Sequence, residues 1–540
     1  MRNIYVMTAT EKTGFGQGIE KKTNLIFWLL LIALIAFGGI LYFQTTLQGV
    51  GLVSDSVNYI NGARSISAGN GYYRESGGGT LKPITNFPPL YSILLSILLW
   101  FKMDWFAAVR IFGLIFFILN LGLTGILVRE ITKNIWFGLC AVVLMLVLKP
   151  FLYFQVFAMS ESLFFFCTLA AFLFCVFALE TGKSIHWIFC GLFCGLAFLT
   201  RYVGIISFIT MLSVLILNRR IKGSLKSILW LLIGAVPLIS SWLIRNVIVS
   251  GNASNREFFF HPVGSAEIKD GILIFWKWLF PVRYQNVEQP VFWMEWAVIG
   301  FAVAAFLFLL ILFLLSFKKN TDFSPYINCQ WIFAMYIFCY LAFIWATISF
   351  FDASVNIEER ILFPVFLVLV LLIFITGEFI VQRRKWFFQL AMIGFYGYFV
   401  ITFSQDLIRF VPKFQSEGYG WAWEGWRTSP AMQIIRELPS EMMIYSNQPE
   451  AVSLWAGRGS FALLDPIDPS TNLPREDYSD TMDRIRNQVL DGESVLVFFG
   501  IDSWIGGTTG NWITELCETL PMIYQDSSEW VVGRKGMKEK

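Results

Sequence analysis

The first polar segment of the chain holds a side chain suited to proton transfer. It reads Asp55-Ser-Val-Asn-Tyr59 and follows an apolar run that ends near residue 44. A carboxylate at this position can accept a proton from an attacking hydroxyl group, or it can hold a cation. The structural alternative is an acid at the membrane interface, or one that caps a helix beginning at Ser56, because aspartate is preferred at helix N-termini. The residue alone leaves both interpretations open.

A second acid, Glu161, stands where another apolar run begins. Ser160 precedes it and could cap the expected helix, and a glutamate in the first turn complements the positive end of the helix dipole. These roles are a sufficient structural reason for both residues. The functional interpretation is that Glu161 faces the same cavity as Asp55, because the charge pattern puts both on one side of the membrane.

Three arginines border apolar runs on that same predicted side, namely Arg201, Arg245 and Arg360. Arginine near hydrocarbon is costly and usually faces a polar cavity or a partner. Because the planar guanidinium group binds phosphate through two parallel hydrogen bonds, three arginines at one level could clamp a phosphate. The alternative for each is an interfacial anchor whose charged end snorkels to water.

His261, in Phe-Phe-Phe-His261-Pro262, is the remaining candidate for substrate binding. A lone histidine beside proline is more often a loop residue than a ligand. The chain has two histidines and no Cys-x-x-Cys motif, so we expect no metal site built on imidazole or thiolate groups. A divalent metal held in another way stays open, and no other cofactor is indicated.

The composition indicates that membrane-spanning helices position these side chains. Of the 540 residues, 56% are hydrophobic and 15% are charged, whereas an ordinary globular domain is roughly 25% charged. The net charge of +3 is too small to suggest nucleic-acid binding. We therefore expect a polytopic α-helical membrane protein.

About eleven apolar runs are long enough to cross a bilayer, which takes about 17 to 25 residues. They lie at 25–44, 108–128, 135–150, 162–179, 185–200, 202–217, 228–247, 291–316, 329–350, 361–381 and 386–403. The stretch 185–217 is either two short crossings or one re-entrant pair. A further apolar stretch that ends at Phe101 is expected to lie along the interface, or to dip into the membrane and return.

Positive charges orient this bundle, because Lys and Arg gather in the cytoplasmic loops of membrane proteins. The basic groups recur in alternate short loops, at Lys12/Lys21/Lys22, Arg129/Lys133, Lys183, Arg219/Arg220/Lys222/Lys226, Lys318/Lys319 and Arg383/Arg384/Lys385. We therefore expect an inner or plasma membrane protein with a cytoplasmic N-terminus. Three segments then lie on the opposite side, namely 45–107, 248–290 and the chain after 404.

The chain changes character after Gln405. We expect residues 1–404 to form the membrane domain, with 45–107 as its first outer loop, and residues 405–540 to form a small α/β domain outside the cytoplasm. The expected strands lie at 442–445, 494–499 and 530–532, and the expected helices near 431–437, 449–456, 480–489 and 511–520.

Taken in order, these pieces resemble the GT-C superfamily of polyprenyl-phosphate-sugar-dependent glycosyltransferases, in the branch of the protein O-mannosyltransferases and the aminoarabinose transferases. The resemblance covers roughly residues 25–400. Four motifs carry it, namely Asp55-x-x-x-Tyr59-x-x-x-Ala63 running on to Gly69-x-Gly71-Tyr72, Phe87-Pro88-Pro89-Leu90-Tyr91, Ser160-Glu161 and Arg360-x-x-x-Pro364. Many relatives have Glu after the first Asp, whereas this chain has Asp55-Ser56, so the phosphate contacts must come from elsewhere.

The resemblance implies a reaction. In such enzymes the acid of the first outer loop is taken as the general base, which carries over to Asp55, and Glu161 would be the second acid near the cavity mouth. A sugar on a polyprenyl-phosphate carrier would pass to an acceptor hydroxyl of a lipid, glycan or protein, with inversion at the anomeric carbon. The implied substrate-binding residues are Tyr59, Arg201, Arg245, Arg360 and His261, with the arginines on the carrier phosphate.

A polytopic transporter or flippase of lipid-linked or small polar substrates is the alternative from a different class. It would be favoured by ionisable residues at mid-membrane and by helices broken at Gly or Pro in both halves. Here the acids and arginines gather at the outer ends of the predicted spans instead. A non-catalytic scaffold that displays the C-terminal domain is the third interpretation, and the long loop with Asp55 argues mildly against it.

Overall fold

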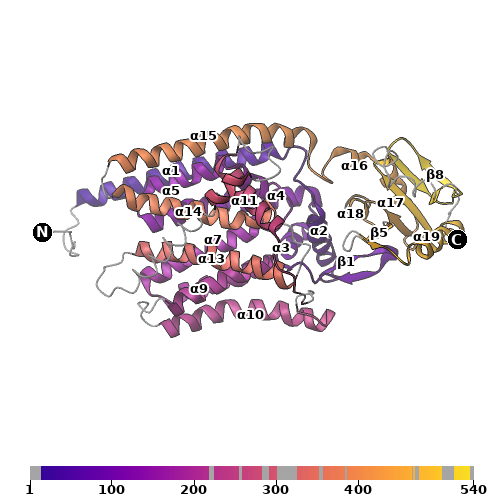
Figure 1. Cartoon of the computed structure of the whole chain (residues 1–540), viewed down its shortest axis with the longest axis horizontal. Coiled ribbons are helices and arrows are strands. Elements are labelled where there is room, and N and C mark those ends of the chain that lie inside the picture. Colours follow the sequence, from indigo (N-terminus) through magenta and orange to yellow (C-terminus); the bar gives the residue numbers. More distant parts are fainter. Residues whose placement is uncertain are drawn as a thin grey trace.

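The computed structural model has a bundle of long helices at one end of an elongated molecule and a mixed α/β unit at the other (Figure 1). Between them lie short elements that come mainly from residues 45–107. The structure describes residues 14–217, 224–253, 258, 260–281, 291–298, 300, 325–351, 357–382, 386–464, 466–468, 473–501, 516–517 and 519–534.

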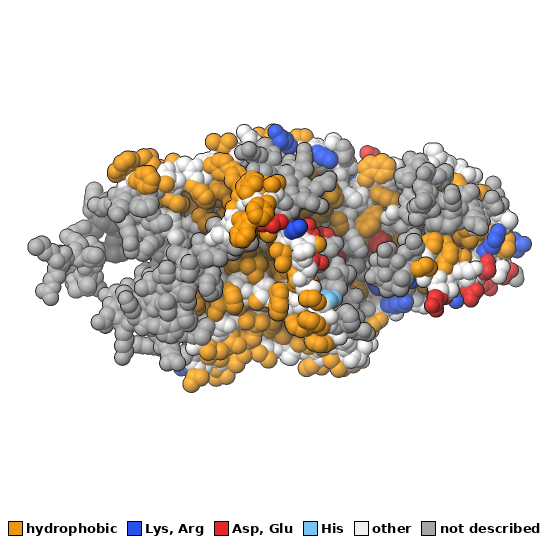
Figure 2. Space-filling view, in the orientation of Figure 1, with side chains coloured by type: hydrophobic (Ala, Val, Ile, Leu, Met, Phe, Trp, Pro, Cys, Tyr) orange, Lys and Arg blue, Asp and Glu red, His pale blue; other side chains and the backbone are white. Residues whose placement is uncertain are grey.

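The bundle consists of long apolar helices that run side by side (Figure 1). They are α1 (Gly14–Thr45), α4 (Trp105–Thr132), α5 (Ile135–Val147), α7 (Glu161–Thr181), α8 (Ser184–Thr200), α9 (Ile205–Leu217), α10 (Ser224–Ser250), α13 (Pro325–Phe350), α14 (Glu359–Gln382) and α15 (Trp386–Glu417). Their facing side chains form one continuous core. Large apolar side chains such as Leu29 on α1 and Ile393 on α15 stay exposed, which suits helices that face lipid. Hydrophobic side chains dominate the described bundle surface in Figure 2.

Seven helices of the described chain are long and apolar enough to cross a membrane, and the bent pair α5–α6 makes eight if it is one span. The helices α3 (Leu90–Trp100), α8 and α9 are apolar but shorter. The count of about eleven crossings therefore stays a prediction. The expected span 291–316 falls mostly outside the described residues, whereas each of the others coincides with a helix or with the bent pair.

The bend after α5 brings a lysine to the surface of the bundle. The short helix α6 (Lys149–Gln155) leaves α5 at an angle of 69°. Pro150 lies in the first turn of α6, where a missing N–H costs nothing and the fixed φ favours a new helix. The bend therefore places Lys149 at the junction of the two helices.

The end of α4 and the end of α7 meet at one end of the bundle, where the sequence predicts cytoplasmic loops. Lys133, which follows α4, pairs with Glu180 in the last turn of α7 at 2.7 Å. The opposite end carries the start of α7, the start of α14 and the C-terminal α/β unit (Figure 1). We call this opposite end the sheet end. Which side of the membrane each end faces stays a prediction.

Beyond α15 the chain forms a five-stranded sheet with the order β4-β3-β7-β9-β8. The strands are β3 (Met443–Ser446), β4 (Phe461–Ala462), β7 (Ser494–Phe499), β8 (Met522–Gln525) and β9 (Glu529–Val532). β3 runs parallel to β4 and β7, and β9 runs antiparallel to β7 and β8. Every side chain of β7 is buried, as expected for a central strand covered on both faces.

Short helices accompany this sheet. They are α16 (Glu424–Thr428), α17 (Pro430–Glu437), α18 (Pro449–Ala451), which continues into the turn η3 (Val452–Ala456), and α19 (Tyr478–Asp491). The strands and helices expected from the sequence lie at these positions, but the helix expected near 511–520 falls mostly outside the described residues. The last long helix of the bundle continues to Glu417, past the division expected at residue 404.

The α/β unit contacts the loop that contains Asp55. Asn61, on α2 (Ser54–Ser67), donates to Ser453 Oγ at 2.6 Å. Arg64, one turn further along α2, donates to the carbonyl oxygens of Ser453 and Leu454 at 3.2 and 3.0 Å. These contacts fix α2 between the bundle and the sheet.

Candidate active site

Asp55 lies in the first turn of α2 and is 25% exposed. The N-cap position of this helix is Val53, not Asp55, so the capping alternative raised by the sequence is wrong. The carboxylate instead accepts a hydrogen bond at Oδ2 from Nη2 of Arg360, at the start of α14. The loop of residues 45–107 and a distant long apolar helix therefore meet at this acid.

The chain just before Asp55 is fixed by backbone pairing. Gly51 forms a β-bridge with Phe157, and the next residue, Leu52, forms one with Gly420. The added Cβ of any other residue at Gly51 would lie 2.6 Å from the Phe157 ring, so glycine is needed for this close approach. Three segments far apart in sequence are thus joined directly before the acid.

Glu161 is the first residue of α7 and is 1% exposed. Its Oε1 atom accepts from Nε of Arg360 and pairs with Nη1 of Arg201. Its Oε2 atom is buried without a hydrogen-bond partner among the described residues. Because an ionised carboxylate is costly to bury alone, the two guanidinium groups are what permit Glu161 to lie here.

Ser160 does not cap α7 through its side chain, contrary to the expectation from the sequence. Its hydroxyl group instead shares a hydrogen bond of 2.8 Å with the hydroxyl group of Tyr59. Tyr59 is 3% exposed and packs against Phe87 and Tyr91, and burial raises the pKa of its phenol above the ordinary value. Tyr59 therefore joins α2 to the start of α7 and positions the two acids relative to each other.

Four of the predicted site residues thus form one network, which we call the acid–arginine cluster: Asp55, Glu161, Arg201 and Arg360. Two carboxylates face two guanidinium groups, so the cluster has no surplus charge. Arg360 makes the connection between the acids, since it bonds to both of them. Acid–base catalysis at a charged leaving group needs a proton acceptor, a fixed geometry and nearby cations. The acid–arginine cluster contains all three.

Arg245 lies apart from this cluster. Its Nη1 atom donates to the carbonyl oxygen of Ile84 at 2.6 Å, and Nη2 donates to that of Tyr72 at 3.2 Å. Its guanidinium group also lies 5.0 Å from the ring centre of Trp242. Arg245 therefore binds the loop of residues 45–107 to α10, and the expected group of three arginines is reduced to two.

His261 lies in a segment without regular secondary structure. Its backbone N–H donates to the carbonyl oxygen of Ser349 at the end of α13. This placement agrees with the loop interpretation, and a role in substrate binding stays a prediction.

A known family matches part of the sequence. Residues 86–244 match the family described as dolichyl-phosphate-mannose-protein mannosyltransferase. This segment includes Glu161 and Arg201 but neither Asp55 nor Arg360. No curated protein matches the chain.

Solved structures match nearly the whole chain. ArnT from Cupriavidus metallidurans bound to undecaprenyl phosphate has a TM-score of 0.51 and 13% identity, over 94% of this chain and 97% of that one. The archaeal oligosaccharyltransferase AglB from Archaeoglobus fulgidus, in complex with an inhibitory peptide and a dolichol-phosphate, has a TM-score of 0.52 and 11% identity, over 94% and 75%. The chain has the GT-C fold. The resemblance drawn from the motifs and the class of polytopic helical membrane protein are thereby confirmed.

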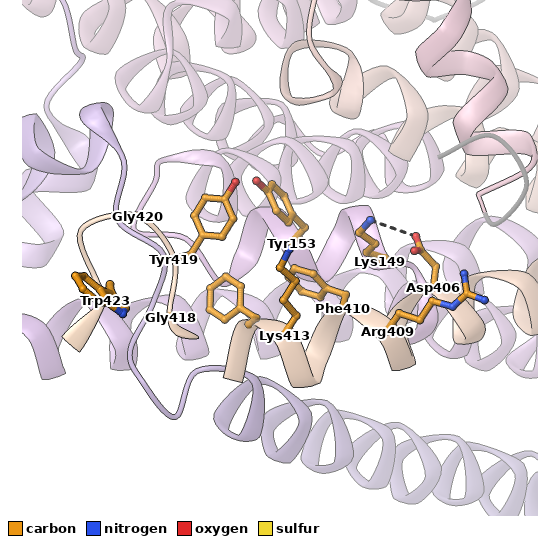
Figure 3. A pocket seen from close by; sticks show the side chains of 11 residues that line it. Lys149, Tyr153, Asp406, Arg409, Phe410, Lys413, Gly418, Tyr419, Gly420 and Trp423 are labelled. Atoms are coloured by element: carbon orange, nitrogen blue, oxygen red, sulfur yellow. Dashed lines mark ion pairs between the residues drawn. The ribbon is translucent and has the colours of Figure 1, made fainter. Parts of the chain in front are cut away.

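The fold also contains a basic cavity that the sequence did not lead us to expect. It measures about 740 Å³ and lies between α6, the end of α15 and the following linker (Figure 3). Lys149, Arg409 and Lys413 line it. Two features of the sequence could have indicated this cavity. Lys149 ends an apolar run, and Arg409 and Lys413 are four residues apart, which places them on one face of a helix.

The same cavity reaches toward the acid–arginine cluster. Tyr153 lines it and packs against Phe157, which pairs with Gly51 just before Asp55. Gly420, which lines the opposite wall, is the residue that pairs with Leu52 just before Asp55. The cavity and the cluster are therefore built on the same joined segments.

No group of three or more His, Cys, Asp or Glu side chains in the described part of the chain is arranged to hold a metal ion. Asp55 and Glu161 are bridged by the guanidinium group of Arg360.

Proposed function

We propose that the chain is a membrane glycosyltransferase that moves a sugar from a polyprenyl-phosphate carrier to an acceptor hydroxyl group at the outer face of the membrane. The observation that carries this proposal is the acid–arginine cluster, in which a partly exposed carboxylate is fixed beside a buried one by a shared arginine. The GT-C fold and the lipid phosphates bound by its structural neighbours support the choice of donor.

Asp55 serves as the general base in this proposal. Only its Oδ2 atom takes part in a bond among the described residues, and the side chain is 25% exposed, so a hydroxyl group can approach the carboxylate from water. Asp55 removes the hydroxyl proton as the oxygen attacks the anomeric carbon. The bond from that carbon to the phosphate oxygen breaks, and its electron pair stays on the phosphate. A single displacement of this kind inverts the anomeric carbon.

Glu161 has a supporting role rather than a proton-transfer role. It is buried at the start of α7 and binds both arginines through one oxygen atom. It thereby fixes the guanidinium group that orients Asp55. Preorganised charge of this kind stabilises a transition state because no group has to reorient during the reaction.

A transporter or flippase is the second candidate function. Its support is a groove in the helix bundle whose lining is apolar, which would suit a lipid-linked cargo. One assay separates the two: the purified protein in lipid nanodiscs is mixed with polyprenyl-phosphate-linked sugars and membrane-extract acceptors, and released polyprenyl phosphate is followed. Release above the level of an Asp55→Asn control supports the transferase. Binding without release supports the transporter.

A further inference from the structure

The basic cavity has a surplus of positive charge that the acid–arginine cluster lacks. Lys149, Arg409 and Lys413 face a single acid, Asp406, which pairs with Lys149 at 3.5 Å. In Figure 3, Lys149 turns toward Asp406. Three basic groups against one acid favour an anion, whereas in the cluster each guanidinium group already has a carboxylate partner.

An apolar groove lies next to this cavity. It measures about 320 Å³ and is lined by side chains of α5, α11 (Ser265–Leu279), α14 and α15, among them Leu148, Ile373, Phe399 and Phe403. Its lining is entirely hydrophobic, with six phenylalanine rings. An acyl or isoprenoid chain is the kind of ligand that such a lining accepts.

The groove and the cavity are lined by neighbouring residues of two segments. Leu148 lines the groove, and the next residue, Lys149, lines the cavity. On α15, Phe403 lines the groove and Asp406, about one helical turn closer to the sheet end, lines the cavity. The basic cavity therefore lies at the sheet end, and the apolar groove lies deeper in the bundle. This is the shape of an amphiphile with an anionic head and a long apolar chain.

Both parts also adjoin the acid–arginine cluster. Trp278, which lines the groove, donates through its indole N–H to Oε1 of Glu359, the residue before Arg360. Tyr153 contributes a wall to the cavity and packs against Phe157, the residue that pairs with Gly51 just before Asp55. An amphiphile bound here would thus lie next to the segments that carry Asp55 and Arg360.

We propose that the phosphate of the polyprenyl carrier binds in the cavity formed by Lys149, Arg409 and Lys413, with the isoprenoid chain in the adjoining groove. This inference rests on the proposed function and assigns the phosphate to a site other than the two arginines of the cluster. Arg201 and Arg360 then position the acids, and the lysines neutralise the leaving phosphate.

The test of the head-group site measures binding by the full-length protein. Fluorescent polyprenyl phosphate is titrated into phosphatidylcholine nanodiscs that hold the wild type, Lys149→Ala, Lys413→Ala, Arg201→Ala or the control Lys102→Gln. Lys102 is an exposed basic residue between α3 and α4 that lines neither the cavity nor the groove. Loss of a charged hydrogen-bonding partner predicts affinity about tenfold or more weaker in both lysine variants. The control should match the wild type.

The outcomes separate this inference from the proposed function. Normal binding in both lysine variants, with loss in Arg201→Ala, would move the phosphate to the acid–arginine cluster and overturn the inference while leaving the function intact. A wild type that binds no polyprenyl phosphate would contradict the proposed function itself. Equal displacement of the probe by phosphatidylglycerol would mean a general site for anionic phospholipids, which also overturns the inference.

The chain-binding groove has its own test. Ile373→Trp fills the groove, and Ile393→Trp makes the same change on the exposed face of α15. We expect Ile373→Trp to weaken binding of a long polyprenyl phosphate several-fold and to leave the affinity for a two-isoprene phosphate unchanged. Ile393→Trp should alter neither. Equal affinity of the wild type and Ile373→Trp for the long lipid would exclude the groove as the site of the chain.

Discussion

Arg360 and Glu161 meet where two transmembrane helices begin, and the Nε atom of the arginine donates to Oε1 of the buried acid. The same guanidinium group donates to Asp55 from its Nη2 atom. One side chain therefore connects α14 to both candidate acids. The two acids differ in their surroundings, because Glu161 is 1% exposed and Asp55 is 25% exposed. Exposure makes Asp55 the acid that an acceptor can reach.

The first prediction concerns this exposed acid. Asp55→Asn should lower transfer ~10²- to 10⁴-fold, because the amide cannot accept the hydroxyl proton. Carrier affinity should stay close to that of the wild type, since the carrier phosphate binds elsewhere in our proposal. Turnover and carrier binding are measured on the same preparation, with Glu75→Gln as a control from the same loop. Near-normal turnover of Asp55→Asn would show that another group is the base.

The second prediction concerns the buried acid. Glu161→Gln should destabilise the protein, because Arg201 and Arg360 would lose their shared carboxylate in a site with little solvent. Breaking a buried ion pair in this way costs about 3 to 5 kcal/mol. The unfolding midpoint in detergent should fall, and turnover should fall with it. An unchanged midpoint with lost turnover would instead give Glu161 a direct part in the chemistry.

The third prediction compares substitutions of Arg360. Its guanidinium group bonds to two carboxylates through different nitrogen atoms, which a single ammonium group cannot reproduce. Arg360→Lys should therefore keep part of the turnover that Arg360→Ala loses, and neither variant should weaken carrier binding as much as Lys413→Ala does. Equal turnover of the lysine variant and the wild type would mean that only charge matters here.

The sequence was sufficient to find much of the site. Apolar length and charge alternation placed most of the helices, because both reflect the bilayer directly. Four site residues could be selected because a charged side chain at the end of an apolar run is costly and usually has a partner or a function. They are Asp55, Glu161, Arg201 and Arg360. Their direct connection could not be predicted, since it depends on how α2, α7 and α14 pack.

Other features of the site could not be predicted, because they depend on contacts between residues that are far apart in the sequence. Arg245 lies near the end of an apolar run, as Arg201 does, yet it bonds to the carbonyl oxygens of Tyr72 and Ile84. The basic cavity combines residues from a helix bend near Lys149 with residues more than two hundred positions later. Ser160 precedes a helix as a capping residue would, but the nearby hydroxyl group of Tyr59 bonds to it instead.

The fourth prediction tests the orientation in the membrane. Cysteines introduced at Ser76 and Ser440 should react with an impermeant thiol reagent in intact cells, whereas one at Ser224 should not. The reason is the cluster of basic residues around position 224, which the positive-inside rule places in the cytoplasm. Most native cysteines of the described chain are buried, so the background is low. Labelling of a cysteine at position 224 in intact cells would contradict the predicted orientation.

The last prediction concerns the contact between the α/β unit and α2. Arg64 donates to two carbonyl oxygens of the turn η3, and its guanidinium group lies 4.7 Å from the ring centre of Trp105. Burial lowers its pKa to about 10, so it remains charged at neutral pH. Arg64→Ala removes this connection while leaving the acid–arginine cluster chemically unchanged.

We expect Arg64→Ala to lower turnover ~10-fold or more, because small displacements of a catalytic group are costly, while carrier affinity stays at the wild-type level. Hydrogen exchange of the α2 amides should become faster, which reports the loosened helix directly. Arg484→Ala, at an exposed position on α19, is the matched control and should change neither quantity. If α2 exchange accelerated with no loss of turnover, the α/β unit would not be needed to position Asp55. If exchange stayed at the wild-type rate, the bonds from Arg64 would not be what fixes α2.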